Sequence, residues 1–311
     1  MKPKFRYLME ERCFSCLLAL GEESTHGLHQ ECFRNWFGVD GLHTPFQLTM
    51  KTSGNSNDPK AEINSSFFHG KFRKYSAKLG GSSYIIKVRQ PSFPDLPAME
   101  FLCNQIAKRL GVNVPDFYFI QLEGEPAFIS KNFMEKYPGA DLVHLYRFLG
   151  EQPFDLETIL KVISDHTGKA ADIEQFIKLC LFDVFIGNHD RHGRNLALIQ
   201  TTQGKLLSPT YDNPSCLGIE EESFLKAVLE PCGKIHSSRS KEPKMREYAL
   251  DFCEMGYEEL VAQFYLSIAL QEIIDLVNRS FISPTRKTAF SKLLHRRYHE
   301  LKKVADAHSN R

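Results

Sequence analysis

A polar loop of nine residues lies between two apolar segments near the middle of the chain. Residues 176–186, before the loop, carry apolar side chains at helical spacing, and residues 196–199, after it, form a short strand-like run. The loop itself, residues 187–195, reads Gly-Asn-His-Asp-Arg-His-Gly-Arg-Asn. Any fold of this chain has to hold these charged and hydrogen-bonding side chains between two apolar elements. We therefore expect the rest of the chain to be arranged around this loop.

The spacing of polar residues in and after the loop is typical of phosphoryl transfer. Four residues separate Asp190 from Asn195, as in the catalytic loop of protein kinases, where the Asp accepts the proton of the substrate hydroxyl and the Asn holds Mg²⁺. A predicted hairpin around the turn 201–204 follows, and Asp212 comes after it. Asn195 and Asp212 offer the oxygen ligands that Mg²⁺ prefers. We predict that they bind the metal and that Asp190 is the catalytic base.

A β-rich lobe is predicted around Lys87. Lys87 is the one charge in the strand-like run 84–88, so its ammonium is expected to point into a cleft and to contact ATP phosphates. Glu100 follows thirteen residues later, in the first turn of a predicted helix over 97–111, where it can pair with Lys87 and fix its rotamer. Each residue also has a simpler explanation: a solvated lysine on an edge strand, and a glutamate that suits a helix N-terminus.

The loop carries further cationic residues. We expect His189, Arg191 and His192 to make it locally cationic and to help keep Asp190 ionised, so we count His189 with the catalytic group. The same stretch also reads His-Asp-x-His, which is compatible with a metallohydrolase. That alternative leaves Lys87, Glu100 and Asp212 without a role.

The N-terminal region contains two paired motifs of metal-ligand type. Cys13 and Cys16 form a Cys-x-x-Cys pair, and His29 and Cys32 form a His-x-x-Cys pair, so the four side chains could hold a structural Zn²⁺ in a small knuckle. His26 could replace His29. The alternatives are reduced core cysteines or a disulfide formed on isolation.

Length and composition allow one large core or two lobes. The chain has 311 residues, of which 42% are hydrophobic, and we predict an α+β, two-lobed protein-kinase-like fold with a small β-rich N-lobe and a mainly helical C-lobe. The predicted segments are 1–38 (Cys/His knuckle), 39–64 (connector), 65–136 (N-lobe, with strands over 113–122 and 127–134 and a hinge near 134–136) and 137–311 (C-lobe). In the C-lobe we expect helices over 141–149, 154–166 and 171–186. A last basic helix, from Pro284 to about Ala305, is expected to turn its cations to solvent.

Charge and hydropathy exclude several classes. A net charge of +1 gives no general attraction to nucleic acid or to a membrane. The chain has no run of about 18 or more apolar residues, so no membrane-spanning helix is expected. The first residues lack the apolar core of a secretory signal. The eight cysteines are widely spread, which favours a reducing cytoplasm.

The motifs taken together resemble the HipA kinases of bacterial toxin–antitoxin modules, especially the short HipT form. The stretches that carry the resemblance are Tyr84-Ile85-Ile86-Lys87, Met99-Glu100-Phe101 followed by 110–116, the loop 187–195, and Ser208-Pro209-Thr210-Tyr211-Asp212. They occur in order across about residues 63–300. Short HipA-like proteins also often begin with a Cys-x-x-Cys and His-x-x-Cys segment before Phe-Gly, which here is Phe37-Gly38.

The resemblance implies an ATP- and Mg²⁺-dependent serine/threonine protein kinase that acts as a toxin. Known members phosphorylate aminoacyl-tRNA synthetases and arrest translation. Their partner is a small helix-turn-helix antitoxin, HipB, through which DNA is contacted indirectly. Because the nucleotide lid is reached by about residue 65, the chain is expected to lack the N-terminal subdomain of longer HipA proteins, so a HipS-like small protein is a further implied partner.

The lid departs from the family pattern. Aligning the lid on Gly70 and Lys74, which we count with the nucleotide-binding residues, puts Phe67 and His69 where the family carries serines. One of those serines can be autophosphorylated to inactivate the enzyme. The remaining candidates for autophosphorylation here are Ser65, Ser66, Ser53 and Ser56.

Two other functions stay open from the sequence. A kinase-shaped binding protein could act mainly as a co-repressor with a DNA-binding antitoxin. A small-molecule kinase of the aminoglycoside type would use the same three residue types, a catalytic Asp and a metal-binding Asn and Asp.

Overall fold

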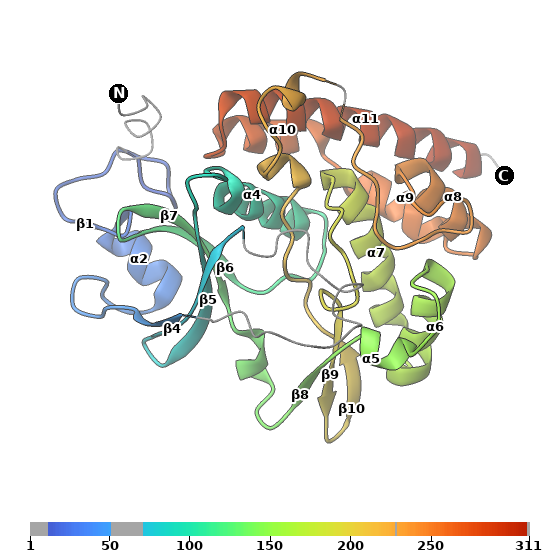
Figure 1. The fold of residues 1–311 in the computed structure, drawn as a ribbon, viewed down its shortest axis with the longest axis horizontal. Helices are drawn as coiled ribbons and strands as arrows, with labels where there is room; N and C mark the ends of the chain where they lie inside the picture. The colour runs from blue at the N-terminus through green and yellow to red at the C-terminus, as the bar shows by residue number, and fades with distance from the viewer. Residues whose placement is uncertain (1–11, 51–70, 228, 310–311) are drawn as a thin grey trace.

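Two lobes meet along one face in the computed structural model, which describes residues 12–50, 71–227 and 229–309 (Figure 1). The smaller lobe is built on an antiparallel sheet, and the larger lobe is mostly helical. The predicted α+β, two-lobed class is therefore confirmed. Predicted residues Gly70, Ser53, Ser56, Ser65 and Ser66 lie outside the described ranges.

The N-lobe sheet has the strand order β3-β4-β5-β7-β6. Its strands are β3 (Gln47–Met50), β4 (Arg73–Leu79), β5 (Ser82–Val88), β6 (Phe117–Leu122) and β7 (Glu125–Lys131). β3 lies within the stretch read as a connector and pairs with β4. Gly80 and Gly81 form the turn between β4 and β5 with φ of +56° and +85°, which L-residues with side chains rarely adopt. Helix α4 (Leu96–Arg109) packs on β6 and β7 and lies between the sheet and the C-lobe (Figure 1).

The N-terminal segment covers one end of this sheet. It consists of β1 (Ser24–Thr25), β2 (Leu28–His29) and α2 (Gln30–Phe37). Phe37 lies with its ring 4.7 Å from that of Tyr118 on β6 and 5.8 Å from that of Tyr84 on β5, so an aromatic cluster joins the helix to the sheet.

The C-lobe begins with a small second sheet. After the 3₁₀ turn η1 (Phe133–Lys136), β8 (Asp141–His144), β9 (Ala197–Thr201) and β10 (Gly204–Leu207) form a sheet in the order β10-β9-β8. The hairpin of β9 and β10 confirms the predicted turn. The helix predicted over 141–149 is wrong in its first half, because Asp141–His144 pairs with β9 and only α5 (Tyr146–Leu149) is helical. Cross-strand pairing here overrides local helical spacing.

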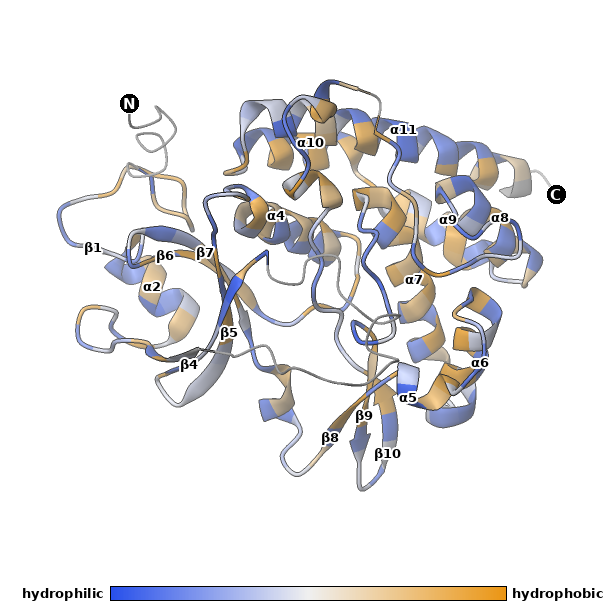
Figure 2. Ribbon diagram, in the orientation of Figure 1, coloured by the Kyte–Doolittle hydropathy of each residue, from blue (hydrophilic) through white to orange (hydrophobic). Residues whose placement is uncertain are grey.

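The C-lobe helices pack around α7. They are α6 (Leu156–Thr167), α7 (Ala170–Ile186), α8 (Met245–Glu254), α9 (Glu258–Ser267), α10 (Leu270–Arg279) and α11 (Pro284–Ser309), with 3₁₀ turns η2 (Cys216–Gly218) and η3 (Phe224–Lys226). Helix α7 contacts α6, α8, α9 and α11. Apart from Lys178, every residue from Phe176 to Ile186 is buried, and all of these except Asp183 are apolar, in line with the mostly orange colour of α7 in Figure 2. A helix that is buried on nearly all sides is a core helix.

Two basic residues of the last helix are not solvated, contrary to expectation: Arg286, which pairs with Asp95 at 3.0 Å, and Arg297. Arg297 is fully buried, and its guanidinium donates to the carbonyl oxygen of Pro231 at 2.8 Å and to Glu300 at 2.7 Å. The sequence alone gives no sign of this, because neighbouring Arg296 is partly exposed and pairs with Glu230 at the surface.

No single helix in the described ranges is long and apolar enough to cross a membrane. The bent pair α9 and α10, which meet at 51°, reaches the required length and composition only when the two are taken together.

Gly187 ends α7 in the left-handed region, with φ of +71°, and delivers the chain into the polar loop. A Cβ at Gly187 would lie 2.6 Å from Pro231 Cγ and 2.9 Å from Leu293 Cδ2, whereas a Cβ at Gly168, the left-handed cap of α6, meets nothing within 4 Å.

We predict that Gly187→Ala destabilises the fold more than the matched control Gly168→Ala. Both variants carry the left-handed strain of roughly 1–2 kcal/mol, and only Gly187→Ala adds an overpacking cost of about 1–3 kcal/mol. Urea unfolding of the two variants measures the difference. Equal losses would show that the close approach at Gly187 is not a constraint.

Candidate active site

A buried ion pair fixes the start of the polar loop. Asp183, in the last turn of α7, accepts from Arg191 Nε at 2.8 Å and from Arg191 Nη2 at 3.0 Å, and both side chains are buried. The contact is bidentate, which adds geometric definition to the charge attraction. Asp183 also accepts from Asn188 Nδ2 at 2.9 Å, and Asn188 Oδ1 in turn accepts from the backbone N–H of Asp190 at 3.0 Å.

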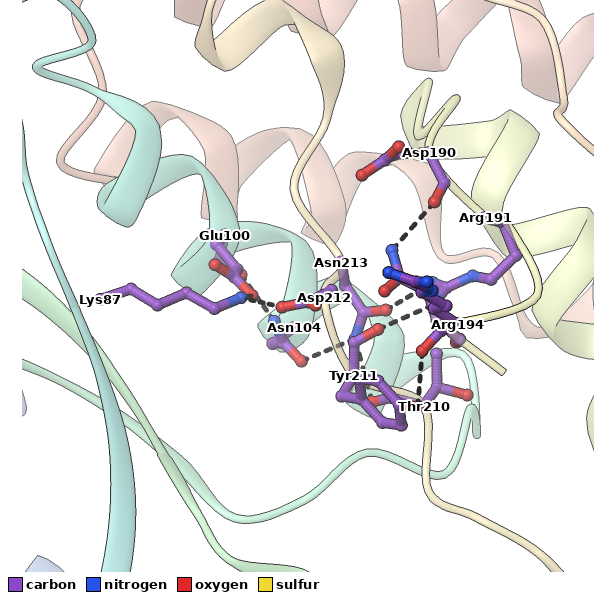
Figure 3. A network of polar contacts seen from close by, with 11 residues as sticks. Lys87, Glu100, Asn104, Asp190, Arg191, Arg194, Thr210, Tyr211, Asp212 and Asn213 are labelled. Carbon is purple, nitrogen blue, oxygen red and sulfur yellow. Dashed lines mark hydrogen bonds and ion pairs between the residues drawn. The ribbon is translucent and has the colours of Figure 1, made fainter. Parts of the chain in front are cut away.

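The same guanidinium brings two distant segments together (Figure 3). Arg191 Nη1 donates to the carbonyl oxygens of Asn195 at 3.1 Å and Tyr211 at 2.7 Å, and Nη2 donates to Asn213 Oδ1 at 2.6 Å. The loop and the segment after the hairpin are thus held by one side chain. Asn195 and Asp212, the two predicted metal ligands, lie on these two segments.

The side-chain amides of Asn213 and Asn104 extend these hydrogen bonds from the C-lobe to the N-lobe. Asn213 Nδ2 donates to Asn104 Oδ1 at 3.0 Å, and Asn104 Nδ2 donates to the carbonyl oxygen of Glu100 at 2.8 Å. Both Asn side chains are buried. Helix α4, which positions Glu100, is therefore linked by hydrogen bonds to the C-lobe segment that contains Asp212.

Lys87 lies between two carboxylates. Its buried ammonium is 2.5 Å from Glu100 Oε1 and forms a second ion pair with Asp212 Oδ1 (Figure 3). Burial disfavours the charged lysine, but Asp212 and Glu100 outweigh it and raise the pKa of Lys87 above its ordinary value. Burial likewise acts against the Asp212 carboxylate, yet Lys87 and Lys74 hold the pKa of Asp212 well below its usual range. Lys87 and Asp212 are therefore both charged at neutral pH.

Glu100 behaves differently from Asp212. Burial raises the pKa of Glu100, and Lys87 offsets this only in part. The backbone of Asp212 also sets it apart, because its φ of +54° lies in the left-handed region that Asp tolerates better than most residues.

A cavity of about 390 Å³ lies between the lobes and contains these groups. Its charged lining residues are Lys74, Lys87, Glu100, Lys131 and Asp212, and its apolar ones include Ile85, Phe117, Phe128, Phe133, Met134 and Leu142. Lys74 lies directly opposite Lys87 in the register of β4 and β5. An apolar cavity of this size with a few converging polar groups is typical of a small-molecule site.

The loop residues Asp190 and Asn195 are buried but do not line this cavity. Asn195 Nδ2 donates to the carbonyl oxygen of Asp190 at 3.0 Å. His192 Nδ1 accepts from the backbone N–H of Arg194 at 3.1 Å, and its Nε2 lies 3.9 Å from Asp190 Oδ1.

The expectation of a cationic loop is wrong. Burial lowers the pKa of His189 and of His192, so both rings favour the neutral form. The charge of Arg191 is paired with Asp183. Among the residues that the structure describes, the one cluster of three or more potential metal ligands is at the N-terminus, so His189, Asp190 and His192 do not form the metal site of the hydrolase alternative.

The predicted zinc ligands do come together. Cys13, Cys16, His29 and Cys32 place their ligand atoms within 4.8 Å of one another. His26 does not join them, because its Nδ1 is 2.9 Å from the carbonyl oxygen of Gln121 on β6.

The sequence reasoning missed Asp183, Asn104 and Asn213. A signal existed for Asp183, which is the only carboxylate in the apolar run 176–186. Nothing local marks Asn104 or Asn213, whose partners lie on elements remote in sequence.

The chain belongs to the family of HipA-like C-terminal domains, whose profile matches residues 54–283. A protein of Sinorhizobium fredii (strain NBRC 101917 / NGR234), named as a candidate kinase, Y4dM, is 28% identical over an alignment of 152 residues. The alignment covers 42% of this chain and 37% of that protein's length. The chain thus matches little more than a third of that relative.

Two solved kinase structures share the fold. The Helicobacter pylori proinflammatory kinase CtkA superposes with a TM-score of 0.63 at 16% identity, covering 75% of this chain and 93% of CtkA. HipA of Shewanella oneidensis MR-1, solved with HipB and operator DNA, superposes with a TM-score of 0.55 at 17% identity, covering 84% of this chain and 74% of that one. The lobes and the cavity between them therefore belong to a kinase-type fold.

We predict that Arg191→Met lowers the free energy of unfolding by about 3–5 kcal/mol, because Asp183 is left buried without its cation. The control Arg296→Met removes an ion pair with Glu230 at the surface and should cost about 0–1 kcal/mol. Urea unfolding provides both values. The double variant Asp183→Asn/Arg191→Met should be more stable than Arg191→Met alone, since the unpaired charge is gone. A double variant that loses the sum of both single effects would contradict the pairing.

Proposed function

We propose that this protein is an ATP- and Mg²⁺-dependent serine/threonine protein kinase and acts as the toxin of a bacterial toxin–antitoxin system. The observation that carries the proposal is the placement of Lys87 between Glu100 and Asp212 in the cavity between the lobes. One guanidinium, that of Arg191, ties the segment of Asp212 to the loop of Asp190 and Asn195.

The donor set fits Mg²⁺. Asp212 offers an ionised carboxylate, and Asn195, whose amide N–H₂ is directed to the Asp190 carbonyl, offers Oδ1. When bound, Mg²⁺ neutralises charge on the β- and γ-phosphates.

The lysines and the apolar lining fit ATP. Lys74 and Lys87 are like charges directly opposite each other in adjacent strands, an arrangement that is unfavourable without anions nearby. Asp212 and Glu100 balance them in this structure, and phosphates would serve the same purpose in the complex. Ile85, Phe117 and Met134 supply apolar surface for a nucleobase.

Asp190 has the role of base. In the reaction the substrate hydroxyl oxygen forms a bond to the γ-phosphorus, the bond to the β-phosphate oxygen breaks, and the hydroxyl proton passes to the Asp190 carboxylate. Asn188 and Asn195 hold the backbone of Asp190 on both sides, which fixes the direction of its side chain. His192, neutral and 3.9 Å from Asp190, contributes no competing charge.

Partners follow from the family relation. The HipA of Shewanella oneidensis MR-1 was solved with HipB and operator DNA, which supports a HipB-like antitoxin as a partner of this chain and DNA contact through that partner only. A HipS-like small protein and an aminoacyl-tRNA synthetase substrate complete the proposal, with action in the cytoplasm. A non-catalytic co-repressor function is the second candidate, favoured by the same complex.

We predict phosphate transfer from labelled ATP and Mg²⁺ into one member of a panel of purified aminoacyl-tRNA synthetases. Asp190→Asn should lower the rate about 100- to 10,000-fold, because it removes the base, while ATP still binds. Asp212→Asn and Lys87→Met should also abolish transfer. Lys78→Met is a matched control, since Lys78 lies exposed on the same β4 strand as Lys74 and does not line the cavity.

Two results would redirect the assignment. ATP binding without transfer to any protein, together with a HipB-like complex that still forms, would support the co-repressor. Label that appears only in a small hydroxyl compound would support a small-molecule kinase.

We also predict autophosphorylation on one of Ser53, Ser56, Ser65 and Ser66. Phosphopeptide mapping of wild type after incubation with ATP should place the phosphate on one of them, and Asp190→Asn should carry none. A map of the active enzyme with all four serines unmodified would end this part of the proposal.

A further inference from the structure

The N-terminal Cys/His cluster lies apart from the kinase cavity and has the geometry of a metal site. His29 Nδ1 lies 3.3 Å from Cys16 Sγ and 3.9 Å from Cys32 Sγ, and with Cys13 Sγ all four ligand atoms fall within 4.8 Å of one another. Zn–S bonds of about 2.3 Å in a tetrahedron place ligand atoms about 3.8 Å apart. Adjustments of a few tenths of an ångström up to about 1 Å bring the cluster to that geometry.

The orientation of His29 selects the coordinating nitrogen. Its Nε2 lies 2.8 Å from the carbonyl oxygen of Ala19, an acceptor, so the neutral ring carries its proton on Nε2. Nδ1 therefore presents a lone pair to the three thiols. A histidine whose second nitrogen donates to a backbone carbonyl is the usual arrangement of a metal-bound imidazole.

The segment has little secondary structure of its own. It contains two strands of two residues each and one helix of eight residues. Elements this small are held by packing on a larger body, and a cross-link or a metal adds the internal constraint that they lack. All eight cysteines are free thiols in the structure, so no disulfide supplies that link.

The knuckle reaches both lobes through Phe14. Phe14 lies between the first two ligand cysteines and is buried, with its ring 4.9 Å from that of Phe119 on β6 and 5.0 Å from that of Phe281, which precedes α11 in the C-lobe. Phe119 and Phe281 also stack on each other at 5.4 Å. Gly27 allows this close packing, because a Cβ there would lie 2.5 Å from the Phe14 ring.

The turn between β1 and β2, which contains His26, is also hydrogen-bonded to the N-lobe sheet. Gln121 donates its backbone N–H to the carbonyl oxygen of His26 at 2.8 Å, and Gln121 accepts at its own carbonyl oxygen from His26 Nδ1 at 2.9 Å. His26 therefore serves the sheet contact, which separates it from the metal cluster.

We propose that Cys13, Cys16, His29 and Cys32 bind one structural Zn²⁺, and that this ion fixes Phe14 as a clamp between the N-lobe sheet and the C-lobe. The proposal does not depend on kinase activity.

The first test is metal content of the full-length protein purified under reducing conditions. Elemental analysis should find about one zinc per chain in wild type. Cys16→Ser and Cys32→Ser should lose it, while Cys232→Ser, at a partly buried cysteine outside the cluster, and His26→Ala should keep it. If wild type contains no zinc, or if Cys16→Ser retains it, the proposed zinc site is wrong.

A second test does not depend on whether the serine variants fold. In Co²⁺-loaded protein, the variant His29→Cys should still bind one metal and shift the visible d–d absorption bands relative to wild type, as expected when sulfur replaces nitrogen. An unchanged spectrum would exclude His29 as a ligand.

The clamp has its own readout. Removal of zinc by a chelator should increase hydrogen exchange in three places: the knuckle, β6 around Phe119, and the segment around Phe281. Phe14→Ala should keep the zinc but show the faster exchange at Phe119 and Phe281 without chelator. Faster exchange confined to residues 12–38 would keep the metal site and reject the clamp.

Discussion

The buried contact between Arg191 and Asp183 is the interaction on which the rest of the site depends. Moving two charges out of water is costly unless hydrogen bonds satisfy both ions. Here every nitrogen of the guanidinium donates, to Asp183, to Asn213 and to the carbonyl oxygens of Asn195 and Tyr211. A lysine could not replace it, because a point charge with three donors lacks the planar fork that reaches several segments at once. The main role of Arg191 is therefore to hold together α7, the polar loop and the segment after the hairpin, more than to add stability.

The hydrogen bonds that start at Arg191 also link the two lobes. Asn213 donates a hydrogen bond to Asn104, and Asn104 donates to the backbone carbonyl oxygen of Glu100. The side chain of Glu100 in turn pairs with Lys87. A rotation of α4 away from the sheet would break the ion pair of Glu100 and Lys87 and also the amide contact to the C-lobe. The pairing of Lys87 and the placement of Asp212 are thus parts of a single arrangement.

Much of this could be predicted from the sequence. The pairing of Lys87 with Glu100 follows from a charge inside a β-branched run and a carboxylate early in the next helix, and the structure has this ion pair. The second ion pair of Lys87, with Asp212, was not predicted, because the sequence indicated Asp212 only as a metal ligand. The missed features depend on burial or on pairing between segments remote in sequence, and local spacing reveals neither. His189 favours the neutral form because burial lowers its pKa, and the buried Arg297 donates to the carbonyl oxygen of Pro231, which is remote in sequence. The strand β8 forms because β9 pairs with it, although its residues also fit a helix.

The left-handed backbone of Asp212 has a consequence for substitution at this position. Asp and Asn enter this conformation more readily than most other residues with side chains, because their short polar side chains can hydrogen-bond to nearby backbone. A glutamate offers the same carboxylate chemistry, but it would carry it one methylene farther out on a backbone that it adopts less readily. The fold therefore discriminates between two acids of nearly equal acidity by chain geometry alone. Homologous sequences that keep an acid at this position should therefore carry aspartate far more often than glutamate.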